Sequence, residues 1–156
     1  MTQKAFQDYY TEDFSHCYGC GRLNEHGLQI KSFWDGDESV AKFLPDENHI
    51  AIPGFVYGGL IASLVDCHCV GTAAAATYKA ESRDMDTEPA LRFVTASLKI
   101  NYLAPTPLGV ELEIRGKVVE VKGKKVIVDA EVIANNKTCA TGNVVAVQMP
   151  DTMKTK

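Results

Sequence analysis

The fold is decided by residues 58–78, which read GGLIASLVDCHCVGTAAAATY. Leucine, isoleucine and valine recur at intervals of three to four residues, and four consecutive alanines follow, a pattern typical of an α-helix. Asp66 is the only ionised side chain between Ile50 and Tyr78. The sequence therefore predicts a helix from about Gly58 to about Tyr78 that is apolar on nearly every side.

An apolar run of this length could also cross a membrane. Asp66 lies near the middle of the run, where a carboxylate costs roughly 2.5–3.5 kcal/mol to insert into a bilayer. Pro53-Gly54 interrupts the run early, and its flanks show neither an asymmetry of lysine and arginine nor a belt of tryptophans. We therefore expect a helix that is surrounded by the rest of a soluble protein, and no membrane as a partner.

Beyond the helix, and in a shorter stretch before it, apolar and polar residues alternate with the period of two that predicts β-strands. The expected strands span residues 28–34, 39–43, 96–102, 110–121, 125–133 and 138–149. Tight turns are expected at Lys122-Gly123 and Asn135-Asn136, because glycine and asparagine tolerate a positive φ. A helix that is apolar all round needs burial on more than one side, which an antiparallel sheet curled around it provides. We predict an α+β fold in a single domain that spans residues 1–156.

Length, composition and charge narrow the classes of function. The 156 residues are 46% hydrophobic and 23% charged, which is typical of one globular domain and excludes a disordered chain. The 16 basic residues against 20 acidic ones give a net charge of −4, so we expect no nucleic-acid partner. The first residues lack the apolar segment of a secretory signal, and the cysteines number 5, an odd count. We therefore expect reduced thiols and a cytoplasmic location.

Two features of the helix indicate where chemistry could take place. An ionised aspartate is costly to bury, and Asp66 shares its helix face with the small residues Gly59, Ala62 and Ser63. That face could border a pocket or a second subunit, with Asp66 as base or nucleophile. Gly58 and Gly59 open the helix, and their free amides at the positive end of the helix dipole suit a developing oxyanion. The sequence contains no Gly-x-Ser-x-Gly motif, which argues against an α/β-hydrolase triad.

Three segments resemble the hotdog-fold acyl-CoA thioesterases of the phenylacetate-degradation type. Residues 52–66 (IPGFVYGGLIASLVD) are similar to the family's Pro-Gly-x-Val-His-Gly-Gly segment and to the apolar run that leads to an acidic residue. Residues 95–108 (TASLKINYLAPTPL) form the second match, and residues 16–21 (HCYGCG) with Gly27-Leu28 form the third. The resemblance implies a hotdog fold, in which a curved antiparallel sheet wraps one long central helix. It also implies the hydrolysis of an acyl-CoA thioester to a free acid and CoA.

The resemblance further implies roles for individual residues. The Gly58 amide would polarise the thioester carbonyl, Gly59 would support that turn, and Asp66 would activate water or attack the carbonyl. In the family these groups come from opposite subunits, so we expect a homo-oligomer, a dimer or a tetramer, with its sites at the dimer interface. Thr95 matches a hydroxyl that assists in some relatives, although strict alternation would turn it away from the helix together with Ser97. No cofactor and no metal is expected.

The acyl-CoA substrate is expected to bind near the start of the helix. The sequence does not decide which basic side chains would hold its phosphates. The residues that we expect to contact it are His49, Val56, Tyr57, Ser63 and Asn101. Tyr57 takes the place of the family's usual histidine, and a phenol titrates too high to act as a base at neutral pH. Cys67 takes the place of a glutamate that often follows the aspartate. These departures leave open a protein that binds an acyl-CoA or an acyl carrier without hydrolysis. A hotdog dehydratase or hydratase, another alternative, would need His49 or His68 to converge on Asp66.

The cysteines allow one more alternative. Cys17 and Cys20 form a Cys-x2-Cys pair, and Cys67 and Cys69 flank a histidine, so that soft ligands for zinc are present. Cys67 and Cys69 are two residues apart on a helix, however, and therefore point about 160° away from each other. We expect these cysteines to be structural thiols that pack as small hydrophobic side chains.

Overall fold

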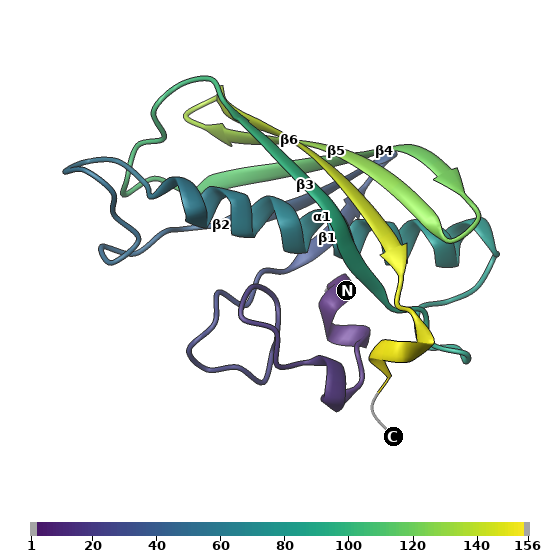
Figure 1. The fold of residues 1–156 in the computed structure, drawn as a ribbon. Coiled ribbons are helices and arrows are strands. Elements are labelled where there is room, and N and C mark those ends of the chain that lie inside the picture. The colour runs from purple at the N-terminus through teal and green to yellow at the C-terminus, as the bar shows by residue number, and fades with distance from the viewer. Residues whose placement is uncertain (1–2, 155–156) are drawn as a thin grey trace.

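A computed structural model describes residues 3–154, and Figure 1 shows how they are arranged. Along the chain the elements are η1 (Phe6–Tyr9), η2 (Glu12–Phe14), β1 (Ser32–Asp35), β2 (Glu38–Phe43), α1 (Gly58–Ala80), β3 (Phe93–Tyr102), β4 (Leu112–Lys122), β5 (Lys125–Ala134), β6 (Lys137–Gln148) and η3 (Asp151–Met153). The three η elements are short 3-10 helices. Residues 1–2 and 155–156, which the single-domain prediction includes, lie outside the described part of the chain.

The strands form one antiparallel sheet in the order β1-β2-β4-β5-β6-β3, and α1 lies across one face of it (Figure 1). Hairpins join β4, β5 and β6 in turn, whereas β3 pairs with β6 at the edge of the sheet. On β5 the alternation is regular, because Val126, Val128 and Val132 are fully buried while Asp129 and Glu131 are exposed. Each valine or leucine buried between helix and sheet stabilises the fold by about 1.5–3 kcal/mol. The predicted long helix on an antiparallel sheet is confirmed.

The N-terminal segment covers the side of α1 that faces away from the sheet (Figure 1). Gln7 of η1 is buried there, and its Nε2 donates a hydrogen bond to Ser32 Oγ at 3.0 Å. The Ser32 amide donates in return to Gln7 Oε1 at 2.8 Å. Gly71 lets η1 come close to α1, because a Cβ at Gly71 would lie 2.8 Å from Gln7 Nε2. The helix is therefore buried from two sides, as its apolar surface requires. The sequence did not predict that the N-terminal segment covers the second side.

The length and apolar composition of α1 would also suit a membrane span. In the structure, 61% of its most apolar window is buried inside the protein. This is the environment of a core helix, and Leu64 and Val65 on it are inaccessible to solvent.

Two strands begin three or more residues away from the predicted position, and the other strands differ by two residues or fewer at either end. β1 begins at Ser32 and not at residue 28, because Gln29 adopts a φ of 53°, which an extended strand does not contain. β3 begins at Phe93, three residues earlier than expected. The turn between β5 and β6 is confirmed, since Asn135 and Asn136 have φ values of 51° and 62°.

A polar network is sealed between α1 and the first strands of the sheet. Ser39 Oγ lies 2.9 Å from His68 Nε2 and 2.7 Å from Thr72 Oγ1, and Ser32 Oγ lies 2.8 Å from His68 Nδ1. All four residues are buried. Burial lowers the pKa of His68 to about 4. The imidazole is therefore neutral at physiological pH and serves as a hydrogen-bonding link within the core.

We expect Ser39→Ala to lower the free energy of unfolding by about 1–3 kcal/mol, because it leaves the buried His68 Nε2 without a partner. Thr72 Oγ1 loses its contact with Ser39 and keeps the hydrogen bond that it donates to the His68 carbonyl at 2.7 Å. Urea denaturation monitored by circular dichroism measures this loss. Ser97→Ala, an exposed serine on β3, is the matched control and should change stability by less than about 0.5 kcal/mol. Equal stability of the Ser39 variant and the wild type would contradict the role given to this network.

Candidate active site

Asp66 lies on the one face of α1 that neither the sheet nor the N-terminal segment fully covers. Its neighbours on this face, Gly59, Ala62, Ser63 and Val70, are all half-buried. Burial raises the pKa of Asp66, and a nearby Cys17 thiolate would act in the same direction, while a hydrogen bond from Thr95 opposes both. The carboxylate is therefore partly withdrawn from water and still reachable from outside.

Thr95 contacts Asp66 directly, since its Oγ1 donates a hydrogen bond to Asp66 Oδ1 at 2.5 Å. The alternation of β3 had suggested that Thr95 faces away from the helix, and the structure corrects this. A β-bulge interrupts the pairing of β3 with β6, in which Thr95 opposes Ala146 and Ser97 already opposes Val145. Ala96 is the extra residue, and it shifts the alternation by one position, so that Thr95 points towards the helix.

The turn that leads into α1 is fixed by backbone hydrogen bonds. Gly54 takes a φ of 90°, which suits glycine, and the Val56 amide then donates to the Thr106 carbonyl at 2.9 Å. Tyr102 Oη donates to the Gly58 carbonyl at 2.6 Å. Gly58 and Gly59 are the first two residues of α1, whose N–H groups have no acceptor within the helix. These amides are therefore available to an anionic or carbonyl oxygen.

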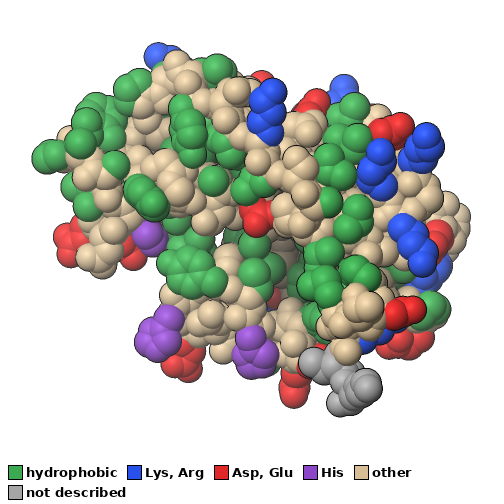
Figure 2. All heavy atoms as spheres, in the orientation of Figure 1, with side chains coloured by type: hydrophobic (Ala, Val, Ile, Leu, Met, Phe, Trp, Pro, Cys, Tyr) green, Lys and Arg blue, Asp and Glu red, His purple; other side chains and the backbone are tan. Residues whose placement is uncertain are grey.

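Two hollows flank this turn. One of about 310 Å³ is lined by Gly58, Val56 and Thr106, among others. The other, of about 390 Å³, is lined by four of the predicted residues, which are His49, Tyr57, Gly59 and Ser63. The Tyr57 ring lies against Gly59, where a Cβ would come within 2.4 Å of it. Figure 2 shows this side of the molecule, where hydrophobic side chains gather in the region in which α1 begins and β3 ends.

Asn101 is separated from the other predicted residues. It lines a hollow of about 630 Å³ together with Lys99, Arg115 and Asp129, which are exposed or half-exposed residues of the sheet. Ile100, its neighbour on β3, packs against the core. Because successive side chains on a strand point to opposite faces, Asn101 faces away from α1.

The structure does not bring Gly58 and Asp66 of one chain together. They are eight residues apart on the same helix, which corresponds to about 12 Å along its axis. Neither histidine of the dehydratase alternative is hydrogen-bonded to Asp66 in the described chain: His49 Nδ1 accepts from the Asp46 amide, and His68 is held in the core network. The Asp66 carboxylate and the Gly58 amide are thus two half-sites at different points of one helix.

Sequence spacing indicated Cys17, Cys20 and Cys67 as soft ligands for zinc but did not predict that these three converge. The sulfur atoms of Cys17, Cys20 and Cys67 all lie within 4.8 Å of one another, beside the helix turn that carries Asp66. Cys69 is on the other side of the helix and fully buried, as its position predicts. Hydrogen bonds from the thiols of Cys20 and Cys67 hold the pKa of Cys17 well below its usual range. The available signal was Cys-x2-Cys, but no sequence pattern shows that this pair packs against Cys67.

Comparisons with known proteins give a consistent result. A family model described as the thioesterase superfamily matches residues 53–141, which is more than half of the chain. A thioesterase superfamily protein from Shewanella loihica PV-4 is 45% identical, with a TM-score of 0.69, over 90% of this chain and 100% of that one.

Two more distant structures share the fold. The PaaI protein from the phenylacetic acid degradation operon of E. coli is 18% identical, with a TM-score of 0.63, over 79% of this chain and 81% of that one. The protein smu.793 from Streptococcus mutans UA159, bound to acetyl CoA, is 20% identical, with a TM-score of 0.62, over 82% of this chain and 96% of that one.

A curated relative is similar over part of its length. Acyl-coenzyme A thioesterase THEM4 from Xenopus laevis is 32% identical over 108 residues, which are 68% of this chain and 43% of that protein. The chain therefore spans less than half the length of this relative.

We expect Tyr102→Phe to lower the free energy of unfolding by about 0.5–1 kcal/mol, because the variant loses the hydrogen bond that fixes the first residue of α1. Thermal and urea unfolding measure the change. Tyr18→Phe is the matched control, since Tyr18 is 58% exposed against 54% for Tyr102. Equal effects of the two variants would show that the Tyr102 hydroxyl does not hold the turn.

Proposed function

The chain belongs to the thioesterase superfamily, and from that premise we propose that it hydrolyses an acyl-CoA thioester to a free acid and CoA. Family membership supports thioester hydrolysis in general terms. A CoA ester as substrate is supported by the curated acyl-coenzyme A thioesterase relative and by the similar structure that holds acetyl CoA. The observation that carries the proposal is the Thr95-bound Asp66 carboxylate on the uncovered face of α1.

In the proposed mechanism, Asp66 takes a proton from water as the water oxygen adds to the thioester carbonyl carbon. The Gly58 amide, at the positive end of the α1 dipole, donates a hydrogen bond to the oxyanion that forms. The carbon–sulfur bond then breaks, and the CoA thiolate leaves and takes up a proton. A thiolate is a good leaving group, so that one carboxylate and one oxyanion-binding amide are sufficient for the reaction.

Thr95 is a positioning residue in this mechanism. Its hydroxyl donates to one carboxylate oxygen of Asp66, which leaves the other oxygen free to accept a proton from water. Tyr57, which stands where the family usually has histidine, lines the hollow with His49 and Ser63. We assign these three side chains to contact with the acyl-CoA and not to proton transfer.

The oligomer is part of the proposal, because Asp66 and Gly58 of one chain are too far apart to act on one carbonyl. A second copy would bring its own Gly58 to Asp66. Two features support such a copy: β3 is an edge strand with unpaired backbone groups, and α1 presents a face of small residues beside it. Large hydrophobic side chains at this edge are exposed, namely Leu98, Tyr102 and Leu103. We propose a dimer, alone or within a tetramer, with two composite sites.

The proposed location is the cytoplasm. All five cysteines are free, including the three whose sulfur atoms cluster, which fits a reducing compartment.

We expect Asp66→Asn to lower kcat/KM for acyl-CoA hydrolysis by about 10²–10⁴-fold, because the amide cannot accept the proton from water. Release of the CoA thiol across a panel of short, medium and aromatic acyl-CoAs measures this. Asp129→Asn, which changes an exposed aspartate on the outer face of the sheet, should retain wild-type turnover. Equal turnover of Asp66→Asn and the wild type would contradict the mechanism. A protein that binds CoA esters in calorimetry and releases no thiol would instead be a non-catalytic binding protein.

We expect Thr95→Ala to lower kcat by about tenfold or less while KM changes little, because Asp66 remains but is held less firmly. Ser97→Ala is the control on the same strand. Rescue of kcat by Thr95→Ser would support the hydroxyl as the relevant group. A loss in Thr95→Ala that matched the loss in Asp66→Asn would show that Thr95 has a larger role than positioning.

A further inference from the structure

The cluster formed by Cys17, Cys20 and Cys67 has the composition and spacing of a metal site, and we propose that it binds one zinc ion. The three sulfur atoms come from two segments far apart in the sequence, since Cys17 and Cys67 are separated by 50 residues. Packing of small hydrophobic side chains gives no reason for three thiols to converge. Metal coordination gives one, because thiolates are preferred ligands of zinc.

The distances within the cluster fit zinc. A zinc–sulfur bond is about 2.3 Å, so two thiolates at tetrahedral positions lie about 3.8 Å apart. Cys17 Sγ and Cys67 Sγ are 3.7 Å apart, and the most distant pair is within 4.8 Å. Closing the cluster around an ion therefore requires side-chain movements of no more than about 1 Å.

The loop that supplies Cys17 and Cys20 is fixed before any ion binds. The Gly21 amide donates to the Cys17 carbonyl at 2.8 Å, and the Leu23 amide donates to the Ser15 carbonyl at 3.0 Å. The Ile30 amide donates to the Gly19 carbonyl at 3.1 Å and closes the far side of the loop.

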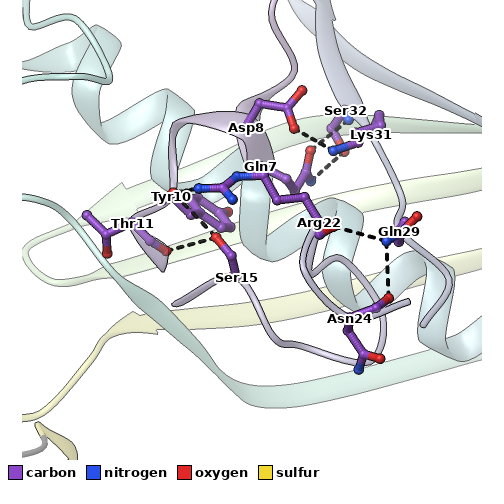
Figure 3. Close-up of polar contacts among 10 residues, drawn as sticks. All are labelled: Gln7, Asp8, Tyr10, Thr11, Ser15, Arg22, Asn24, Gln29, Lys31 and Ser32. Carbon is purple, nitrogen blue, oxygen red and sulfur yellow. Dashed lines mark hydrogen bonds and ion pairs between the residues drawn. The ribbon is translucent and has the colours of Figure 1, made fainter. Parts of the chain in front are cut away.

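Side chains brace the same loop from outside, as Figure 3 shows. Arg22 donates to the Tyr10 carbonyl at 3.2 Å, which ties the loop to η1. Gln29 Nε2 donates to the carbonyls of Arg22 and Asn24, both at 3.1 Å. Because these hydrogen bonds already hold the loop in place, little conformational entropy is lost when the site binds a metal.

Two glycines make room for the cluster. A Cβ at Gly19 would lie 2.3 Å from Cys67 Sγ, so the loop backbone packs directly on that sulfur. A Cβ at Gly21 would lie 2.5 Å from the Cys17 amide nitrogen.

The site has three protein ligands and opens outward. Cys20 is buried, Cys67 is half-buried and Cys17 is exposed, so a fourth position occupied by water would lie on the solvent side. Among residues 3–154, no fourth histidine, cysteine or carboxylate joins the group. Zinc at this position would fasten the loop of residues 15–31 to α1 at the residue that follows Asp66. This role is independent of the catalytic roles proposed above.

Cobalt(II) gives the most direct test, because its spectrum reports both the ligand type and the geometry. The full-length protein, reduced and stripped with a chelator, is titrated with Co²⁺ alone. We expect thiolate-to-cobalt charge-transfer bands and the d–d bands of a four-coordinate ion, saturating at one equivalent. Zn²⁺ should displace the cobalt and raise the melting temperature. Cys139→Ser, a buried cysteine outside the cluster, is the matched control and should retain all of these responses.

Each single serine variant of the cluster should abolish the charge-transfer bands or weaken Zn²⁺ binding by at least about 100-fold; the variants are Cys17→Ser, Cys20→Ser and Cys67→Ser. The loss of an outer-shell contact alone lowers metal affinity about 10–100-fold. Cys17 is exposed, so the Cys17 variant is expected to fold, and circular dichroism checks this for all three. The proposal is overturned if Co²⁺ gives no thiolate bands. It is also overturned if the bands persist in Cys17→Ser, or if peptide mapping of the protein as isolated, without added reductant, finds two of these cysteines in a disulfide.

Discussion

The burial of α1 is the constraint on which the rest of the structure depends. A helix with one carboxylate in 21 mostly apolar residues is stable in water only if other parts of the protein cover it. The sheet covers one side, and the N-terminal segment, locked by Gln7 and Ser32, covers another. What remains uncovered is a narrow face of small residues, and Asp66 lies on it. The same packing that stabilises the fold thus selects the position at which chemistry can occur.

The sequence predicts the elements that depend on local periodicity and on turn chemistry. Periodicity predicts the limits of α1 and the β4–β5–β6 hairpins, and turn chemistry predicts the asparagine turn. It does not predict features that depend on tertiary pairing. The bulge at Ala96 arises from the pairing of β3 with β6 and turns Thr95 towards Asp66, against strict alternation. The cysteine cluster arises because the loop after η2 folds back on α1, and spacing along the chain does not reveal this.

Within the candidate site, the backbone around each predicted residue decides whether that residue lies with the others. His49, Tyr57, Gly59 and Ser63 share one hollow because the turn before α1 folds back on its first residues. Asn101 lies on the opposite face of the sheet, because β3 resumes its regular alternation after the bulge. Asp66 and Gly58 lie on one helix, about 12 Å apart along its axis. One thioester carbonyl therefore cannot contact both residues of the same chain. One chain therefore carries a complete fold and two incomplete half-sites.

The central claim is that each site combines Asp66 of one chain with Gly58 of another, and mixed dimers test it most directly. Asp66→Asn removes the base, and Gly58→Pro removes the amide hydrogen at a helix position that accepts proline, after an extended Tyr57. Each variant alone should be nearly inactive. Dimers that contain one chain of each, isolated through two different affinity tags, should regain about half of the wild-type turnover, because one of their two sites is intact. Mixed dimers no more active than the parent variants would contradict the claim.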